Sequence, residues 1–136
     1  MNEIPAKPIP APDAASEEFF QAAARGKLVL QRCRSCGAWR FQARARCDVC
    51  RSRDAEWAQV TGRAKLISHA KVHQKYHPAF EPDLPYNIAV VELEEGTQLL
   101  TNLVGIDGIE LKPGMPLMVV FEEAGEDVWI PKFRPE

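Results

Sequence analysis

The four cysteines are the residues of this 136-residue chain whose type and spacing point most directly to chemistry. They all lie in the stretch QRCRSCGAWRFQARARCDVC, residues 31–50, in the pattern C-x2-C-x10-C-x2-C. Each Cys-x-x-Cys pair can turn both sulfurs toward one ion, and two pairs supply the tetrahedral four-sulfur shell that Zn2+ prefers. Gly37 suits the tight left-handed turn of the first pair. We therefore predict a zinc site with the ligands Cys33, Cys36, Cys47 and Cys50.

A zinc ion with four cysteine ligands has no open coordination position, which is typical of a structural site and not of a hydrolytic one. Two alternatives stay open on the sequence alone. Iron in the same shell would make a one-electron carrier. Two separate thiol pairs could instead be redox active. Four cysteines in a chain that we expect to be cytoplasmic favour metal ligands over two disulfides.

Other catalytic patterns are not evident in the sequence. No serine lies in a nucleophile-elbow motif, and the eight glycines are scattered at turns without a phosphate-binding loop. His69, His73 and His77 are four residues apart. Their segment alternates like a strand, however, and would separate neighbouring members of the set by about 13 Å. We interpret them as surface or groove histidines and expect no catalysis by this chain alone.

The sequence shows neither a membrane-spanning run nor the pattern of a signal peptide. The longest unbroken apolar run, residues 117–121, is far below the ~20 residues that cross a bilayer. The first residues, MNEIPAKPIPAPD, contain no apolar core of a signal peptide. These patterns predict a cytoplasmic protein without a membrane contact.

The formal net charge of -2 hides a strong asymmetry along the chain. Residues 1–24 carry a net charge of -3, residues 25–53 carry +8, and residues 54–136 carry -7. A basic module around the cysteines therefore lies between two acidic segments. Such a module attracts anions: phosphates of a nucleic acid or a small molecule, or an acidic protein surface.

The periodicity of the chain predicts three parts. Prolines at positions 5, 8, 10 and 12 predict a flexible, extended tail over residues 1–12. Residues 13–60 are predicted to hold a helix, over 14–25 with Asp13 as N-cap, followed by the cysteine ribbon. The adjacent Phe19 and Phe20 on this helix need a cover, either this chain itself or a partner.

Residues 61–136 are predicted to form a small barrel of five short strands, an architecture typical of OB-folds. The first strand, residues 63–73, alternates with period two and predicts one mostly apolar face and one mostly basic face. The remaining strands are expected at 86–94, 97–104, 116–122 and 127–130, separated by turns at Glu95-Gly96, Pro113-Gly114 and Ala124-Gly125.

In an ordered set of stretches, from about Ser16 to Pro135, the chain resembles the DUF35 family, which combines a rubredoxin-like zinc ribbon with an OB-fold. The stretches are GKL (26–28), QRCRSCG (31–37), CDVC (47–50) with Trp57, VTG (60–62), HPAF (77–80), PY (85–86), VVELEEG (90–96), TNLVG (101–105), PGMPL (113–117) and PKFRP (131–135). Two departures concern the second cysteine pair. Proline is usual near the third cysteine, where this chain has Ala45, Arg46 and Asp48. Glycine often follows the fourth, where this chain has Arg51. The resemblance therefore implies intact ligands in a looser second knuckle.

The resemblance implies a non-catalytic accessory subunit that binds acyl-CoA, an acyl-CoA-processing enzyme, or both. Thiolase-like enzymes, hydroxymethylglutaryl-CoA synthase and MaoC-like hydratases are the implied partners, in a hetero-oligomer. Arginine and lysine suit the phosphates of CoA, and aromatic rings suit its pantetheine arm. The candidate contacts are Arg40, Arg44, Phe80, Tyr86, Lys132, Phe133 and Arg134. The alternative function is nucleic-acid binding by a ribbon–OB protein, against which the acidic barrel half argues.

Overall fold

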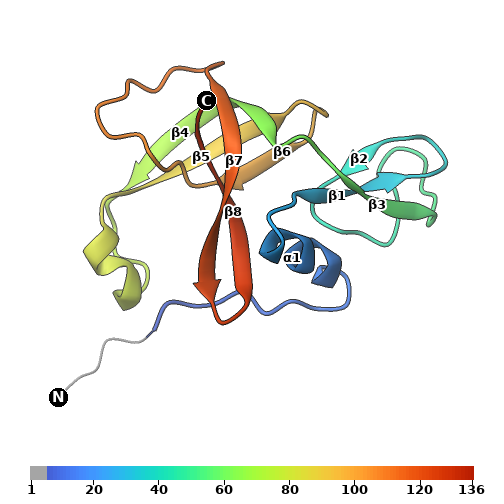
Figure 1. The fold of residues 1–136 in the computed structure, drawn as a ribbon, viewed down its shortest axis with the longest axis horizontal. Coiled ribbons are helices and arrows are strands. Elements are labelled where there is room, and N and C mark those ends of the chain that lie inside the picture. Colours follow the sequence, from blue (N-terminus) through green and yellow to red (C-terminus); the bar gives the residue numbers. More distant parts are fainter. Residues whose placement is uncertain (1–5) are drawn as a thin grey trace.

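The computed structural model describes residues 6–136, and residues 1–5, which include part of the predicted tail, lie outside it. The fold is mainly β, with one N-terminal α-helix, a four-cysteine cluster and a curled five-stranded sheet, as the sequence predicts. Figure 1 shows the cysteine ribbon and the curled sheet as separate units with the helix between them. Within residues 6–136, no helix has the length and apolar character needed to span a membrane.

The ribbon is a three-stranded antiparallel sheet with the order β2–β1–β3. Its strands are β1 (Val29–Cys33), β2 (Trp39–Arg40) and β3 (Ala55–Gln59). The central strand β1 pairs Gln31 with Arg40 on one side and with Trp57 on the other. The two cysteine pairs lie in loops that connect the strands of this sheet. The sheet therefore positions both pairs.

The helix α1 (Glu17–Ala24) is shorter than predicted at its N-terminus. Asp13 does not cap it directly: the Asp13 carboxylate accepts hydrogen bonds from the backbone N–H and the hydroxyl of Ser16, at 2.9 and 2.7 Å. These bonds form a turn of their own before the helix begins. Gly26, at φ 74°, ends the helix in the left-handed conformation that the sequence predicts for it. The helix packs against both β1 and β8 (Val128–Pro135) and so joins the ribbon to the curled sheet.

The curled sheet, called the barrel below, has the antiparallel order β6–β5–β4–β7–β8. Its other strands are β4 (Arg63–Val72), β5 (Tyr86–Leu93), β6 (Gln98–Thr101) and β7 (Pro116–Gly125), with a 3-10 helix η1 (Pro78–Asp83) between β4 and β5. The sheet is a half-barrel that a single parallel bridge, Leu103 to Phe133, closes. Its interior is filled by aliphatic side chains around Phe133, which is completely buried. These are mainly Leu66, Val91, Leu93, Leu99, Leu103 and Leu117.

The prediction of one apolar face along residues 63–73 is wrong for the second half of that strand. Ala64 and Leu66 point into the barrel and are buried. A bulge between Leu66 and Ser68 then shifts the pairing with β5 by one residue. Because side chains alternate with period two, this shift turns Ser68 and Ala70 to the outer face of the sheet. The apolar even-numbered positions therefore begin inside the barrel and end outside it.

Residues 6–12 form no helix or strand and pass the closed end of the hairpin of β7 and β8 (Figure 1). Ile9 lies against Gly125 so closely that a Cβ atom at position 125 would lie 2.5 Å from its Cδ1 atom. The Lys7 ammonium pairs with Asp83 at 2.6 Å and lies 5.5 Å from the centroid of the Phe80 ring. This part of the tail is therefore in contact with the β7–β8 hairpin at Gly125 and with η1 at Phe80 and Asp83.

Candidate metal centre and its surroundings

The two cysteine pairs form knuckles with matching backbone hydrogen bonds. In the first, the Gly37 N–H donates to the Cys33 carbonyl at 2.8 Å. In the second, the Arg51 N–H donates to the Cys47 carbonyl at 2.9 Å. Gly37 and Arg51 both have positive φ, 79° and 64°. The looser second knuckle that the missing glycine implied is not observed, because Arg51 adopts the left-handed conformation despite its Cβ atom.

The four sulfur atoms lie within 4.8 Å of one another. The Sγ atoms of Cys33 and Cys50 are 3.5 Å apart, as are those of Cys36 and Cys47. A tetrahedron with Zn–S distances of about 2.3 Å has edges of about 3.8 Å, which falls inside this range. Cys33 and Cys47 are buried, whereas Cys36 and Cys50 are exposed. The cluster therefore fits one zinc ion close to the surface of the ribbon, held between the two knuckles.

The backbone around the sulfurs favours thiolates at two positions. A hydrogen bond from the backbone of Cys36 lowers the pKa of the Cys33 thiol to about 6. A hydrogen bond from the backbone of Cys50 likewise lowers the pKa of Cys47. At Cys36 the backbone of Ala38 also lowers the pKa, but burial and the neighbouring sulfurs outweigh it and raise the value to about 12. Four thiolates this close repel one another, so a divalent cation is what allows all four to ionise.

Several arginines of the ribbon form contacts within the ribbon itself. Arg34 pairs with Asp54 at 3.1 Å and with Glu56 at 3.6 Å. The guanidinium of Arg32 lies 5.1 Å from the centroid of the Trp39 ring. These contacts correspond to the salt-bridging and solubility role of a basic segment. Fewer arginines are therefore free to bind an external anion than the net charge of the segment suggests.

Of the two ribbon arginines predicted to meet CoA or a partner, one is buried and one is exposed. Arg40 has an exposed fraction of only 5%, and its Nη1 atom donates to the Arg44 carbonyl at 3.2 Å. Its Nε and Nη2 atoms have no hydrogen-bond partner among the described residues. Arg44 is exposed, and its guanidinium pairs with Asp48. The structure therefore uses Arg40 to hold the loop that leads to the second knuckle and leaves Arg44 at the surface.

Three of the predicted contacts on the barrel meet at one cavity. Phe80, Tyr86 and Lys132 line a space of about 420 Å3, which Lys7 also lines. Asn87 and Leu103 also line this space, and the Asn87 Oδ1 atom accepts a hydrogen bond from the Leu103 N–H at 2.6 Å. Lys132 pairs with Glu122 at 2.8 Å. Figure 1 places η1, which carries Phe80, on the side of the barrel opposite the ribbon, so these residues and Arg44 do not share one site.

The last two predicted contacts differ in their exposure. Phe133 is completely buried in the barrel core, where it pairs with Val119. Arg134, the next residue, is exposed. Phe133 therefore occupies a core position and Arg134 a surface position, as expected for neighbours in a strand whose side chains alternate.

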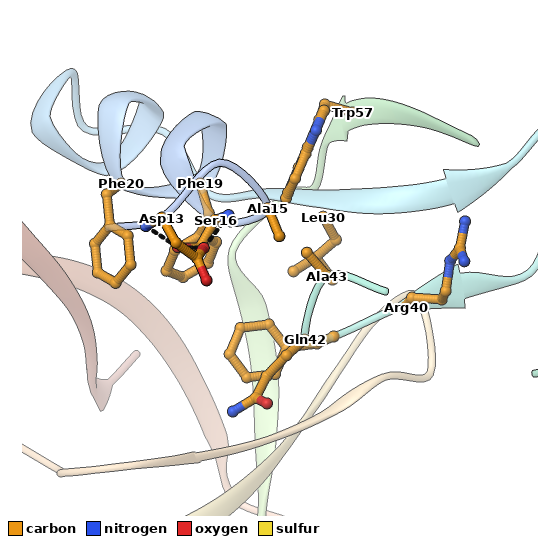
Figure 2. A pocket seen from close by; sticks show the side chains of 11 residues that line it. Asp13, Ala15, Ser16, Phe19, Phe20, Leu30, Arg40, Gln42, Ala43 and Trp57 are labelled. Atoms are coloured by element: carbon orange, nitrogen blue, oxygen red, sulfur yellow. Dashed lines mark hydrogen bonds between the residues drawn. The ribbon is translucent and has the colours of Figure 1, made fainter. Parts of the chain in front are cut away.

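A second cavity, which the sequence reasoning missed, lies between the helix and the ribbon (Figure 2). Its volume is about 260 Å3, and Phe19, Phe20, Leu30, Phe41 and Trp57 supply most of its apolar wall. The rings of Phe19 and Phe20 meet edge to face at 5.2 Å, and Phe19 also meets Phe41 at 5.6 Å. The interpretation that this chain itself covers Phe19 is thus confirmed. The adjacent phenylalanines were the one sequence signal of this space.

A helix, a four-cysteine ribbon and an OB-fold half-barrel in this order define a zinc-ribbon/OB-fold protein. The chain belongs to the DUF35 family. Residues 20–56 match the family described as the ChsH2 rubredoxin-like zinc ribbon domain, and residues 57–122 match the ChsH2 C-terminal OB-fold domain. The ribbon match and the clustered sulfurs together establish Zn2+ as the metal of this site.

Curated relatives agree with this assignment. The chain is 39% identical, over 95% of its length, to a probable enoyl-CoA hydratase alpha subunit of Thermomonospora curvata, but it spans only 40% of that protein. It is 34% identical to a DUF35 domain-containing scaffold protein of Pyrococcus furiosus, covering 80% of this chain and 83% of the relative. A scaffold protein of the same description from Methanocaldococcus jannaschii is 33% identical and is 71% covered.

Two solved structures resemble the fold. A chain of the structure described as Ltp2-ChsH2(DUF35) aldolase matches with a TM-score of 0.81 and 39% identity, over 93% of this chain and 98% of that one. A DUF35 protein of unknown function from Sulfolobus solfataricus matches with a TM-score of 0.61 over 90% of this chain. Its 18% identity supports the shared fold alone.

Proposed function

We propose that this chain is a non-catalytic accessory subunit of an acyl-CoA-processing enzyme. The observation that carries the proposal is the match to a chain of the Ltp2-ChsH2(DUF35) aldolase structure, which covers 98% of that chain at 39% identity. Similarity of this extent, over nearly the whole of both chains, supports a shared role as well as a shared fold. Relatives described as scaffold proteins and as an alpha subunit support the same role.

The chemistry of the metal centre supports a structural contribution to this role. Four cysteine ligands fill the tetrahedral shell, so the zinc ion has no position for water or substrate. Its contribution is to hold the two knuckles together and thereby fix the ribbon beside α1. The chemical step in the complex is therefore assigned to the partner enzyme.

The partner is proposed to be a thiolase-like enzyme, a hydroxymethylglutaryl-CoA synthase-like enzyme or a MaoC-like hydratase. The last of these fits the relative described as a probable enoyl-CoA hydratase alpha subunit, and the structure described as an aldolase supports an enzyme as the partner. In the complex, acyl-CoA is proposed to contact this chain at the cavity lined by Phe80, Tyr86 and Lys132. The aromatic rings suit the pantetheine arm, and the ammonium of Lys132 suits a phosphate.

Affinity purification of the tagged chain from its own organism, followed by mass spectrometry, tests the accessory role. We expect one acyl-CoA-processing enzyme in a stoichiometric complex, stable through size-exclusion chromatography. Recovery of the chain alone, from cells in which such an enzyme is detectably expressed, would contradict the proposal. Mass spectrometry of the same sample identifies the partner class.

Isothermal titration of CoA into the free chain and into the purified complex tests the ligand contact separately. We expect binding to the complex that Lys132→Gln weakens several-fold. Lys27→Gln, a change of the same charge beside β1, serves as the matched control. No heat in either sample would remove the ligand from the proposal and leave the accessory role intact.

A further inference from the structure

Gly125, in the hairpin of β7 and β8, is a glycine that backbone conformation does not require. The other seven glycines of the chain all have positive φ, where glycine is favoured, and Gly125 does not. A Cβ atom at position 125 would meet Ile9 of the N-terminal tail, whose Cδ1, Cγ1 and Cγ2 atoms would lie 2.5, 3.0 and 3.0 Å away. The missing side chain therefore makes room for one particular residue of the tail.

The tail leads from this contact to the cavity at which the acyl-CoA contact is proposed above. Residues 6–12, called the strap below, run from the turn before α1 past the closed end of the hairpin to η1 (Figure 1). At the η1 end, Lys7 pairs with Asp83 at 2.6 Å, and its ammonium lies over the ring of Phe80. All three of these residues line the cavity of about 420 Å3. The strap thus covers part of the cavity's aromatic wall.

The strap is held in place by side chains. Within residues 6–136, no backbone–backbone hydrogen bond joins residues 6–12 to the rest of the chain. Ile9 keeps an exposed fraction of 49%, and the ion pair of Lys7 with Asp83 lies at the surface, where such pairs contribute little. Segments with few buried contacts open locally without unfolding of the domain. The strap can therefore leave its position while the barrel stays folded.

Lys7 covers a surface that a ligand would otherwise contact. The Phe80 ring already meets His77 and Tyr86, at centroid distances of 5.8 and 6.1 Å. The ammonium of Lys7, 5.5 Å from the centroid, occupies a face of the same ring. Because Asp83 neutralises this ammonium, Lys7 in its present position offers a phosphate little net attraction. The strap therefore blocks an aromatic contact without supplying a free charge in exchange.

We propose that the strap regulates this cavity by competing with acyl-CoA for the ring of Phe80, an inference that rests on the ligand contact of the proposed function. With the strap in place, the ring face carries the Lys7 ammonium. With the strap released, the ring is open to the pantetheine arm, and Lys132 stays beside it for a phosphate. The apparent affinity is then the intrinsic affinity multiplied by the fraction of molecules whose strap is released.

Ile9→Ala and Gly125→Ala test the competition, because each disturbs the strap at a position that does not line the cavity. CoA is titrated calorimetrically into the complex of each variant with the partner enzyme, after circular dichroism has shown a wild-type fold. We expect each change to tighten CoA binding about threefold, because the strap is released more often. Ile109→Ala is the matched control and should leave the affinity unchanged, since Ile109 is an exposed isoleucine on the loop before β7.

The double variant Ile9→Ala/Gly125→Ala shows whether the two gains have one cause. Both changes break the same contact, so the double variant should bind CoA no more tightly than the tighter of the two single variants. Gains that multiply would mean that the two residues act independently, and would overturn the strap as their common cause.

NMR spectroscopy of the isotopically labelled free chain tests the position of the strap without any ligand. We expect cross-peaks between the methyl groups of Ile9 and the α protons of Gly125. Their absence would overturn the strap whatever CoA does.

The remaining outcomes separate the competition from the proposed function. Wild-type or weaker CoA affinity in both Ile9→Ala and Gly125→Ala would overturn the competition while the ligand contact and the accessory role stand. No heat from CoA with the wild-type complex or with either variant complex would overturn the ligand contact, and this inference with it, while the accessory role stands.

Discussion

The ribbon and the barrel differ in what holds each of them together. The barrel buries a continuous set of aliphatic side chains around Phe133, on five strands of up to ten residues. The ribbon has strands of five, two and five residues, and beyond its first strand its fully buried residues are Arg40 and Cys47. A sheet this small cannot bury enough apolar surface to order its own loops. Its second half therefore depends on the metal, whereas the barrel depends on packing.

The two units nevertheless share one apolar cluster. Phe19 of α1, Leu28 and Leu30 of the ribbon and Val60 of the connection belong to the same contact set as the barrel core. Figure 1 shows α1 in the position that makes this continuity possible. The ribbon therefore differs from the barrel in what stabilises it only beyond β1. We expect loss of the metal to destabilise that part of the ribbon.

The largest expected effect is that of Cys47→Ser, which removes a buried ligand. We expect the two knuckles and β2 to lose their order, because the remaining ligands cannot hold zinc in a closed shell. The barrel should keep its structure. Hydrogen–deuterium exchange measured peptide by peptide should show rapid exchange over residues 34–54 and wild-type protection over β4 to β8.

Ser35→Ala is the control for that experiment. Ser35 lies between two ligands, and its hydroxyl bonds to that of Ser52 at 2.8 Å without contributing to the sulfur shell. Its exchange pattern should match the wild type. Global unfolding of Cys47→Ser, barrel included, would contradict the separation of the two stabilising mechanisms.

Phe133→Ala is the corresponding change in the barrel and is expected to cost about 3–5 kcal/mol of the free energy of unfolding. The side chain is completely buried at the bridge that closes the half-barrel, so its removal leaves a cavity there. Urea denaturation followed by circular dichroism measures the loss. The zinc content of the folded fraction should stay at one per chain, and its loss at low urea would contradict the comparison.

Gly62→Ala tests the connection between the two units. Gly62 has φ 83°, and a Cβ atom there would lie 2.4 Å from the Cγ1 atom of Val119. The strain of a left-handed alanine alone is about 1–3 kcal/mol, and the contact with Val119 adds to it. Gly114→Ala is the control for the backbone alone, since φ is 86° there with no atom near the Cβ position. A loss no greater than that of Gly114→Ala would show that the contact is unimportant.

The smallest expected effect is a gain, from Arg51→Gly in the second knuckle. Arg51 occupies the left-handed position that Gly37 fills in the first knuckle, at φ 64°. Relief of that strain should stabilise the zinc-bound ribbon by about 1 kcal/mol. Competition with a chromogenic zinc chelator measures it as a severalfold slower metal transfer. An unchanged transfer rate would mean that the two knuckles are equivalent as they stand.

The parts of the fold that local patterns determine could be predicted from the sequence. The cysteine spacing determined the sulfur cluster, and the alternation around Val91 determined a strand with a buried face. The bulge after Leu66 could not be predicted, because it follows from the closure of the sheet and not from any residue beside it. The burial of Arg40 likewise depends on how the loop from Phe41 to Arg46 folds back, which no periodicity encodes.

The close contact between Gly125 and Ile9 determines where added polypeptide leaves the molecule. The contact holds residues 6–12 against the β7–β8 hairpin, and the ion pair of Lys7 directs the tail toward η1. A polypeptide joined directly ahead of Lys7 would leave the molecule beside η1. The C-terminus lies at the other end of the barrel (Figure 1), so a fusion there would emerge on a different side.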